Sequence, residues 1–170
     1  LQVAFNHLHI FIDPTPDAAA TFKERKRLFE AVKCWNEYDT SLISKGGGIF
    51  ERSAKSIKLT PEIKKLLGVT EDSLPPSQVI KAALKMPVDL LWFGGIGTYV
   101  KHSDESHADV GDRANEALRV EGLLYAERLL HDDVAPTPGL LPEDRRFEVL
   151  EVVAWRSDSR RVRRGERSSW

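Results

Sequence analysis

The chain has 170 residues, of which 41% are hydrophobic and 30% are charged, and its formal net charge is −1. This length and composition predict one globular domain with a buried core and exclude an intrinsically disordered chain, while the near-zero charge argues against nucleic acid or acidic membranes as partners. No apolar run approaches the roughly 18 residues of a membrane span. The single cysteine, Cys34, excludes an internal disulfide, which fits a reducing cytoplasm.

The chain begins with a predicted strand and a predicted helix. Residues 1–13 are rich in β-branched and aromatic side chains and end at Asp13-Pro14, which predicts a strand followed by a turn. Apolar residues then recur with helical spacing over residues 17–32, where Asp17 can cap the N-terminus. A turn is predicted at residues 45–50, which contain three consecutive glycines.

The middle of the chain carries further helix and strand signals. Thr60, Pro61 and Gly68 predict the cap, the first turn and the end of one helix. Another helix is expected from Pro76 to Met86, and the apolar run Val88–Trp92 predicts a second strand. A glycine cluster follows that strand, and residues 106–118 are expected to be helical.

Strands that alternate with helices favour a parallel sheet with right-handed crossovers. Only two or three strands are visible before residue 120, which is few for a self-contained doubly wound domain. The predicted fold class is therefore α/β, with an incomplete parallel sheet, flanking helices and an irregular C-terminal tail.

The tail differs from the body in its basic residues. All eleven lysines lie between Lys23 and Lys101, whereas residues 123–170 contain nine arginines and no lysine. We therefore expect a boundary near residue 122 and a divergent, partly disordered tail, in which residues 123–131 can form a turn or two of helix and residues 147–155 are apolar and β-prone. The arginines of the tail favour a solvated end over a nucleic-acid patch, because no aromatic side chains are interleaved to stack on bases.

Two glycine clusters are the candidate binding sites. One cluster follows the predicted strand of residues 88–92, where ligands bind in open α/β sheets, and its candidate residues are Gly94, Gly95, Gly97 and Thr98. The other lies earlier in the chain and can form either an anion-binding nest or a plain flexible turn, and its candidate residues are Lys45, Gly46 and Gly47. No metal site is predicted, since the pair His7 and His9 has no carboxylate or thiol suitably near.

Six segments, in this order, carry a resemblance to a known family. They are Phe5–Pro14 (FNHLHIFIDP), Phe22–Phe29 (FKERKRLF), Tyr38–Phe50 (YDTSLISKGGGIF), Arg52–Ile57 (RSAKSI), Pro87–Lys101 (PVDLLWFGGIGTYVK) and His107–Arg119 (HADVGDRANEALR). Together they resemble the large, multidomain bacterial NAD-specific glutamate dehydrogenases over roughly residues 1–120.

The resemblance implies an enzyme that oxidatively deaminates L-glutamate to 2-oxoglutarate and ammonium and reduces NAD. It implies a Rossmann-like cofactor domain, in which Asn6 lies where an acid can bind ribose hydroxyls. The second implied contact is between the loop of Gly94–Thr98 and the nicotinamide end of NAD. A homo-oligomer and a cytoplasmic location are implied for the full-length family.

Departures from the family pattern leave a second interpretation open. Asn6 and Phe93 replace an aspartate and an asparagine of the family pattern, and no G-x-G-x-x-G loop precedes the first strand. Because the resemblance also places the substrate-binding lysines and the catalytic acid of such enzymes upstream, no catalytic residue is predicted and the isolated chain is expected to be inactive. The alternative is a non-catalytic, truncated remnant or interaction fragment of that family.

Overall fold

The computed structural model of this chain describes residues 1–88, 90–94, 98–122 and 152–155. Their elements, in chain order, are β1 (Val3–Phe5), β2 (His9–Ile12), α1 (Ala18–Glu30), the 3-10 helices η1 (Trp35–Glu37) and η2 (Thr40–Leu42), β3 (Gly48–Glu51), β4 (Ile57–Lys58), α2 (Pro61–Leu67), β5 (Ser73–Leu74), α3 (Pro76–Leu84), β6 (Leu90–Phe93), β7 (Val100–Lys101), α4 (His107–Val110), the 3-10 helix η3 (Arg113–Leu118), β8 (Val120–Glu121) and β9 (Val152–Trp155). Within these ranges, no helix has both the length and the apolar character needed to cross a membrane.

The main sheet has five strands in the order β3-β2-β1-β9-β6, and all four neighbouring pairs are antiparallel. The mixed α/β class is confirmed, but the parallel sheet predicted from the alternation of strands and helices is wrong for the described strands. The short turn between β1 and β2 permits only an antiparallel hairpin. In the described residues the one parallel pair is β7 with β8, in a small separate sheet.

The predicted strand of residues 1–13 is in fact a hairpin, and Asn6 makes its turn. The side-chain Oδ1 of Asn6 accepts hydrogen bonds from the backbone N–H groups of Leu8 and His9, both at 2.8 Å. The backbone N–H of Asn6 also donates to the carbonyl of His9 at 3.0 Å. Asparagine is favoured in turns because its side chain bonds the backbone two or three residues ahead, a signal that the apolar run obscured.

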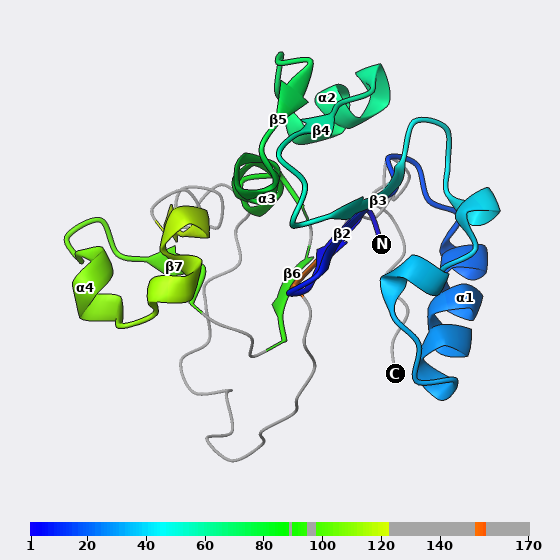
Figure 1. The fold of residues 1–170 in the computed structure, drawn as a ribbon, viewed down its shortest axis with the longest axis horizontal. Coiled ribbons are helices and arrows are strands. Elements are labelled where there is room, and N and C mark those ends of the chain that lie inside the picture. The colour runs from blue at the N-terminus through cyan, green and yellow to red at the C-terminus, as the bar shows by residue number, and fades with distance from the viewer. Residues whose placement is uncertain (89, 95–97, 123–151, 156–170) are drawn as a thin grey trace, which may run out of the picture.

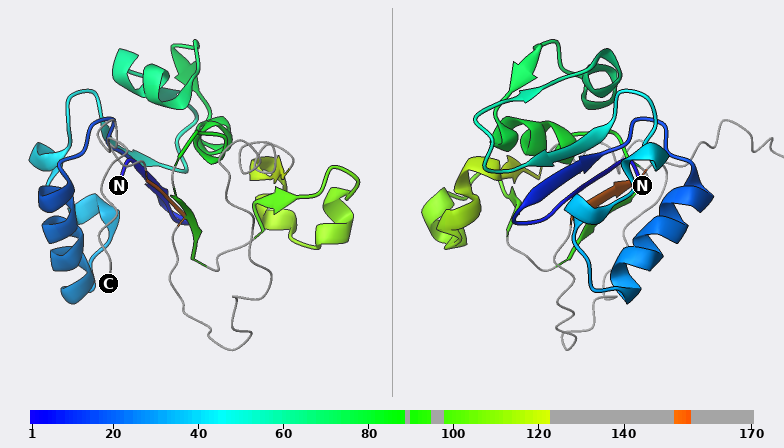
Figure 2. Two further views of the ribbon diagram at one scale, coloured as in Figure 1. Left: turned by 180° about the vertical axis from the view of Figure 1, so that it is seen from behind. Right: turned by 45° about the vertical axis from the view of Figure 1, so that its right-hand side comes forward.

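Side chains from both faces of the sheet enter separate cores. Val3 and Phe5 pack in a cluster with residues of α2 and α3, whereas Ala4 and Phe11 pack with Leu28 of α1 and the aromatic rings of the following segment. Figure 1 shows α1 on one side of the strands and α2 and α3 on the other. The turned views of Figure 2 show the same two layers around the sheet.

The helix signals of the sequence were largely confirmed. Asp17 caps α1 by accepting from the backbone N–H of Ala20 at 2.7 Å. Thr60 caps α2, which ends at Gly68 in a left-handed conformation with φ of 68°. α3 ends at Leu84, close to the predicted end.

The single helix predicted for residues 106–118 is divided in two. Ser106 and Asp109 form a capping box at the start of α4. Gly111, with φ of 71°, ends that helix after one turn, and η3 follows as a 3-10 helix. A glycine with positive φ stops an α-helix because the left-handed residue turns the chain away from the helix axis.

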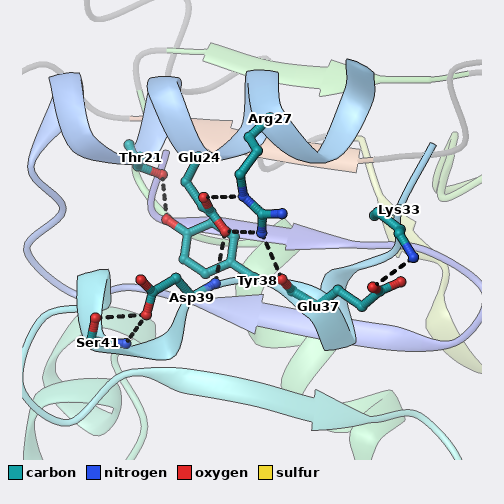
Figure 3. Close-up of polar contacts among 8 residues, drawn as sticks. All are labelled: Thr21, Glu24, Arg27, Lys33, Glu37, Tyr38, Asp39 and Ser41. Carbon is teal, nitrogen blue, oxygen red and sulfur yellow. Dashed lines mark hydrogen bonds and ion pairs between the residues drawn. The ribbon is translucent and has the colours of Figure 1, made fainter. Parts of the chain in front are cut away.

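A buried polar network attaches α1 to the segment that follows it (Figure 3). Glu24 is 6% exposed, and its carboxylate accepts two hydrogen bonds from Arg27 at 2.8 and 2.6 Å and one from the backbone N–H of Asp39 at 2.8 Å. The hydroxyl of Tyr38 donates to Thr21 at 3.1 Å. These bonds fix the approach of the chain to the glycine cluster of residues 46–48.

Within the tail, the structure describes residues 152–155 alone. They form β9, which confirms a strand within the β-prone run predicted at residues 147–155. The other predictions for residues 123–170 lie outside the described residues.

Candidate functional site

The two glycine clusters lie at opposite edges of the main sheet. We call residues 44–48 the first glycine loop and residues 94–98 the second glycine loop. Gly48 pairs with Ile12, so the first loop lies beside the end of β2. Phe93 and Phe5 both pair with Val152, so the second loop and Asn6 leave the opposite edge together.

The first glycine loop is bonded to the end of β2. Asp13 is fully buried, and its Oδ1 accepts hydrogen bonds from the hydroxyl and the backbone N–H of Ser44. Gly47 packs so closely on this strand end that a Cβ atom there would lie 2.5 Å from the carbonyl oxygen of Ile12. Glycine is therefore required at this position by close packing within the chain.

The other side of the first loop is bonded to α2. The hydroxyl of Thr60 donates to the carbonyl of Gly46 at 2.8 Å. Lys45 pairs with Glu62 at 3.4 Å, although the lysine side chain is 91% exposed. The pKa of Glu62 is lowered, first by a hydrogen bond from its own backbone N–H and next by Lys45. The loop is thus held by groups of the chain on both sides.

The second glycine loop is held at its C-terminal end. The backbone N–H of Thr98 donates to Oδ2 of Asp112 at 2.9 Å, and the carbonyl of Thr98 accepts from Nε of Arg119 at 3.0 Å. Gly94, at the other end, is buried, and Thr98 is exposed. The N–H and the C=O of Thr98 are therefore both held by side chains, the first by Asp112 and the second by Arg119.

Arg119 is the central group of this anchor, because it is only 4% exposed and all its bonds stay within the chain. Its Nη2 donates to the carbonyl of Asp112 at 2.6 Å, and its Nη1 lies 2.9 Å from Nδ1 of His107. The pKa of Asp112 is lowered, first by the N–H of Thr98 and next by the side chain of Asn115. The sequence analysis missed Arg119, because only its burial distinguishes it from the other arginines that the structure describes.

An aromatic cluster connects Asn6 to the second loop. The ring of Tyr99 meets that of Phe5 edge-on, with 5.3 Å between centroids, and stacks with that of Phe93 at 6.3 Å. Beside it, Nη1 of Arg52 donates to the carbonyl of Asn6 at 2.6 Å. This edge therefore holds Asn6 at the end of β1 and Gly94 at the end of β6, with β9 between the two strands, and the guanidinium bonded to Asn6 is one that the sequence analysis did not single out.

A cavity of about 430 Å³ opens beside Asn6, between the strand end and α1. Its volume falls in the range of small-molecule sites. Its walls combine apolar rings with basic side chains and consist of Asn6, Phe22, Arg25, Lys26, Leu28, Phe29, Lys33, Cys34 and Trp35. Such a lining suits a ligand that is part apolar and part anionic.

A family model described as bacterial NAD-glutamate dehydrogenase, catalytic domain, matches residues 1–132. The chain belongs to this bacterial NAD-glutamate dehydrogenase family. It is 62% identical over 120 residues to the NAD-specific glutamate dehydrogenase of Halomonas elongata, and 63% identical over 123 residues to that of Pseudomonas aeruginosa. It is 49% identical over 127 residues to the protein of the same name from Mycobacterium tuberculosis.

These matches cover 70–72% of this chain but only 7–8% of the length of the relatives. The resemblance described from the six segments is confirmed, and so is the view that the chain corresponds to a fragment of the family proteins. This chain therefore corresponds to a small part of the relatives it matches.

The predicted site residues of this family member fall into two groups. Asn6 and Gly94 lie at one edge of the sheet and Thr98 ends the loop that begins there, whereas Lys45, Gly46 and Gly47 belong to the opposite edge. Gly95 and Gly97 lie outside the described residues. Within the described ranges, no three His, Cys, Asp or Glu side chains gather as a metal site would require.

Proposed function

We propose that this chain forms one wall of the NAD site of a glutamate dehydrogenase that oxidatively deaminates L-glutamate to 2-oxoglutarate and ammonium. The observation that carries the proposal is the common edge of Asn6 and Gly94, in a chain whose relatives are named NAD-specific. When bound, NAD supplies the hydride acceptor, and the protein's part is to position it. The catalytic side chains of the reaction belong to the longer protein.

The direction of the strands supports a Rossmann-like arrangement in the longer family proteins. β1 and β6 both pair antiparallel with β9, so they run in the same direction and their carboxyl ends meet at one edge. Ligands of open α/β sheets bind beyond the carboxyl ends of such strands. Asn6 and Gly94 are the residues that directly follow these two strands.

The chemistry of the edge fits NAD. Oδ1 of Asn6 is occupied by two backbone N–H groups, so the side-chain amide nitrogen is the group that can donate to a ribose hydroxyl. Arg25, Lys26 and Lys33 in the adjacent cavity supply positive charge for a diphosphate. Main-chain groups of the second glycine loop, with Gly95 and Gly97, would contact the nicotinamide end.

The contact predicted for Lys45, Gly46 and Gly47 stays a prediction. These residues lie at the opposite edge, and the bonds from Thr60, Ser44 and Glu62 already hold their loop. A part in cofactor binding would require a second group of the ligand at that edge. The homo-oligomer, the cytoplasmic location and a domain boundary near residue 122 are likewise proposals for the family protein.

A second candidate function is that of an interaction fragment without catalysis of its own. Large apolar side chains are exposed on two elements, with Leu90 48% and Trp92 53% exposed on β6, and Phe29 84% exposed on α1. Exposed apolar surface of this kind marks contacts with another polypeptide.

Calorimetry with NAD up to millimolar concentration tests the proposal, with circular dichroism to confirm that each variant is folded. The variant Lys26→Ala/Lys33→Ala removes two positive charges beside Asn6, and its matched control, Lys45→Ala/Lys65→Ala, removes two at the opposite edge. We expect about three- to tenfold weaker binding for the first variant and no change for the second. The reverse result would move the site to the first glycine loop. No saturable binding by the folded chain would favour the interaction fragment.

A further inference from the structure

β1 has the burial of a central strand. Val3, Ala4 and Phe5 are consecutive, so their side chains point to both faces of the sheet, and each is at most 1% exposed. A strand buried on both faces is typical of the interior of a sheet and not of its edge. β2 pairs with one side of β1, and β9 pairs with the other.

β9 lies outside the part of the chain that matches the family. The family model covers residues 1–132, which include β1 and β6, whereas β9 is Val152–Trp155. Among the described strands it is β9 that joins these two, since it pairs with β1 over three positions and with β6 over four. Two strands of the family are therefore connected through a segment that the family match does not include.

One face of β6 carries apolar side chains that the described residues leave exposed. Leu90 and Trp92 alternate along β6 and so share one face, where they are 48% and 53% exposed. Through the register Ala4–Val153–Trp92, this face continues the one on which α1 covers Ala4. The sheet is thus covered by α1 at β1 and left apolar and open at β6.

We propose that the gap between β1 and β6 is a strand-acceptor site, and that β9 occupies it as a surrogate. In the longer family proteins the occupant is an extended, apolar segment of at least four residues from outside the part that matches this chain. Only extended backbone offers N–H and C=O groups to neighbours on both sides. The relatives have ample sequence for it, because this chain spans only 7–8% of their length.

The first test uses this chain and amide hydrogen exchange. Val153→Pro and Ala154→Pro each remove a backbone N–H, and successive N–H groups of a strand point to opposite neighbours. Val162→Pro, outside all described strands, is the matched control. We expect at least tenfold faster exchange in Val3–Phe5 or Leu90–Phe93 for the first two variants, with no change in the β2–β3 pair or in the control.

A peptide of residues 147–156 should then bind Val153→Pro and restore slow exchange in both strands. Unchanged exchange in the proline variants would show that the gap does not hold β9. A peptide that gives no protection to a variant whose β2–β3 pair stays protected would show that the gap does not accept a strand.

The second test uses the intact relative from Pseudomonas aeruginosa, so it does not depend on the folding of any proline variant. A photo-crosslinking amino acid replaces the residue that aligns with Trp92, and mass spectrometry identifies the crosslinked peptide. We expect the crosslinked peptide to be an apolar segment of the same polypeptide that lies outside the matched part. Crosslinks confined to the matched part, or to a second copy of the enzyme, would overturn the proposed occupant. NAD binding is not measured, so this outcome is independent of the proposed function.

Discussion

The two glycine loops are both rich in glycine, but different groups of the chain hold them in place. The first loop is bonded on one side to Asp13 at the end of β2 and on the other side to Thr60 and Glu62 of the α2 region. The second loop is held at Thr98, at the far end from the sheet, by Asp112 and Arg119. Glycine content alone therefore does not distinguish a structural turn from a candidate ligand loop.

What distinguishes the loops is where their fixing groups lie. The first loop is fixed in its middle, because Gly46 and Gly47 are themselves the contact points. The second is fixed at Thr98, and residues 95–97 lie outside the described residues. A loop that is fixed at its ends can turn its main-chain groups toward a ligand.

Gly47→Ala should have the largest effect. Its Cβ would lie 2.5 Å from the carbonyl oxygen of Ile12, 2.6 Å from Cγ2 of Ile43 and 2.9 Å from Cδ of Pro14, and two of these belong to backbone or to a proline ring. We expect a loss of about 2–4 kcal/mol in the free energy of unfolding, measured by urea denaturation.

Gly48→Ala is the matched control, because its Cβ would lie 3.2 Å from the ring of Phe50, which can shift. We expect a loss of less than about 1 kcal/mol. Equal losses for the two variants would mean that close packing does not determine the need for glycine in the first loop.

Arg119→Lys should have the next largest effect, and it acts on the second loop. A lysine cannot reproduce the bonds of the buried guanidinium to Thr98, Asp112 and His107. We expect a loss of about 1–3 kcal/mol in the free energy of unfolding, together with faster exchange of the Thr98 amide.

The control for that variant is Arg113→Lys, since Arg113 is exposed. It should leave both the stability and the exchange of Thr98 unchanged. If Arg119→Lys destabilises the chain but does not alter Thr98 exchange, Arg119 does not anchor the second loop.

The pH dependence of stability tests the role of Glu24, which holds the segment that leads to the first loop. The hydrogen bonds from Arg27, more than those from Asp39, lower the pKa of Glu24 from its ordinary value of 4.5 to about 2. Because the folded pKa lies below the unfolded one, the stabilisation is fully present above pH 4.5 and is lost as the pH falls towards 2. Glu24→Gln should lower stability by about 1–2 kcal/mol at pH 7 and remove the part of the pH dependence in that interval that comes from Glu24.

Glu30→Gln serves as the control for Glu24, since the side chain of Glu30 is 63% exposed in a helical ion pair. Its stability should follow that of the unaltered chain at every pH. A wild-type stability that does not fall between pH 4.5 and 2 would contradict the assigned role of Glu24.

Local signals in the sequence predicted local structure well and pairing poorly. Asp17, Thr60 and Gly68 gave the helix boundaries correctly, because capping depends on residues that are neighbours in sequence. The hairpin at Asn6 was missed because the apolar run continues on both sides of the turn. The antiparallel pairs of β9 with β1 and β6 were not predicted, because the position of β9 between them depends on contacts across most of the chain.

The candidate site shows the same division. The glycines were found from their cluster, whereas Arg119 and Arg52 were not, because their importance comes from burial and from bonds to Thr98 and Asn6. No spacing rule connects these arginines to the loops. The sequence also could not show that Lys45 and Asn6 lie at opposite edges, since that depends on the antiparallel register.

Lys45→Ala should have the smallest effect on stability, and it tests whether the first glycine loop contacts the cofactor. The side chain of Lys45 is 91% exposed, and its pair with Glu62 is 3.4 Å long. Exposed ion pairs contribute little, so the free energy of unfolding should change by less than about 0.5 kcal/mol. Lys65→Ala, on the same helix as Glu62, is a control for general charge loss. If Lys45→Ala leaves stability unchanged but weakens NAD binding, the first loop contacts the cofactor in spite of its anchors. If it alters neither quantity, the glycines of that loop are required by packing alone.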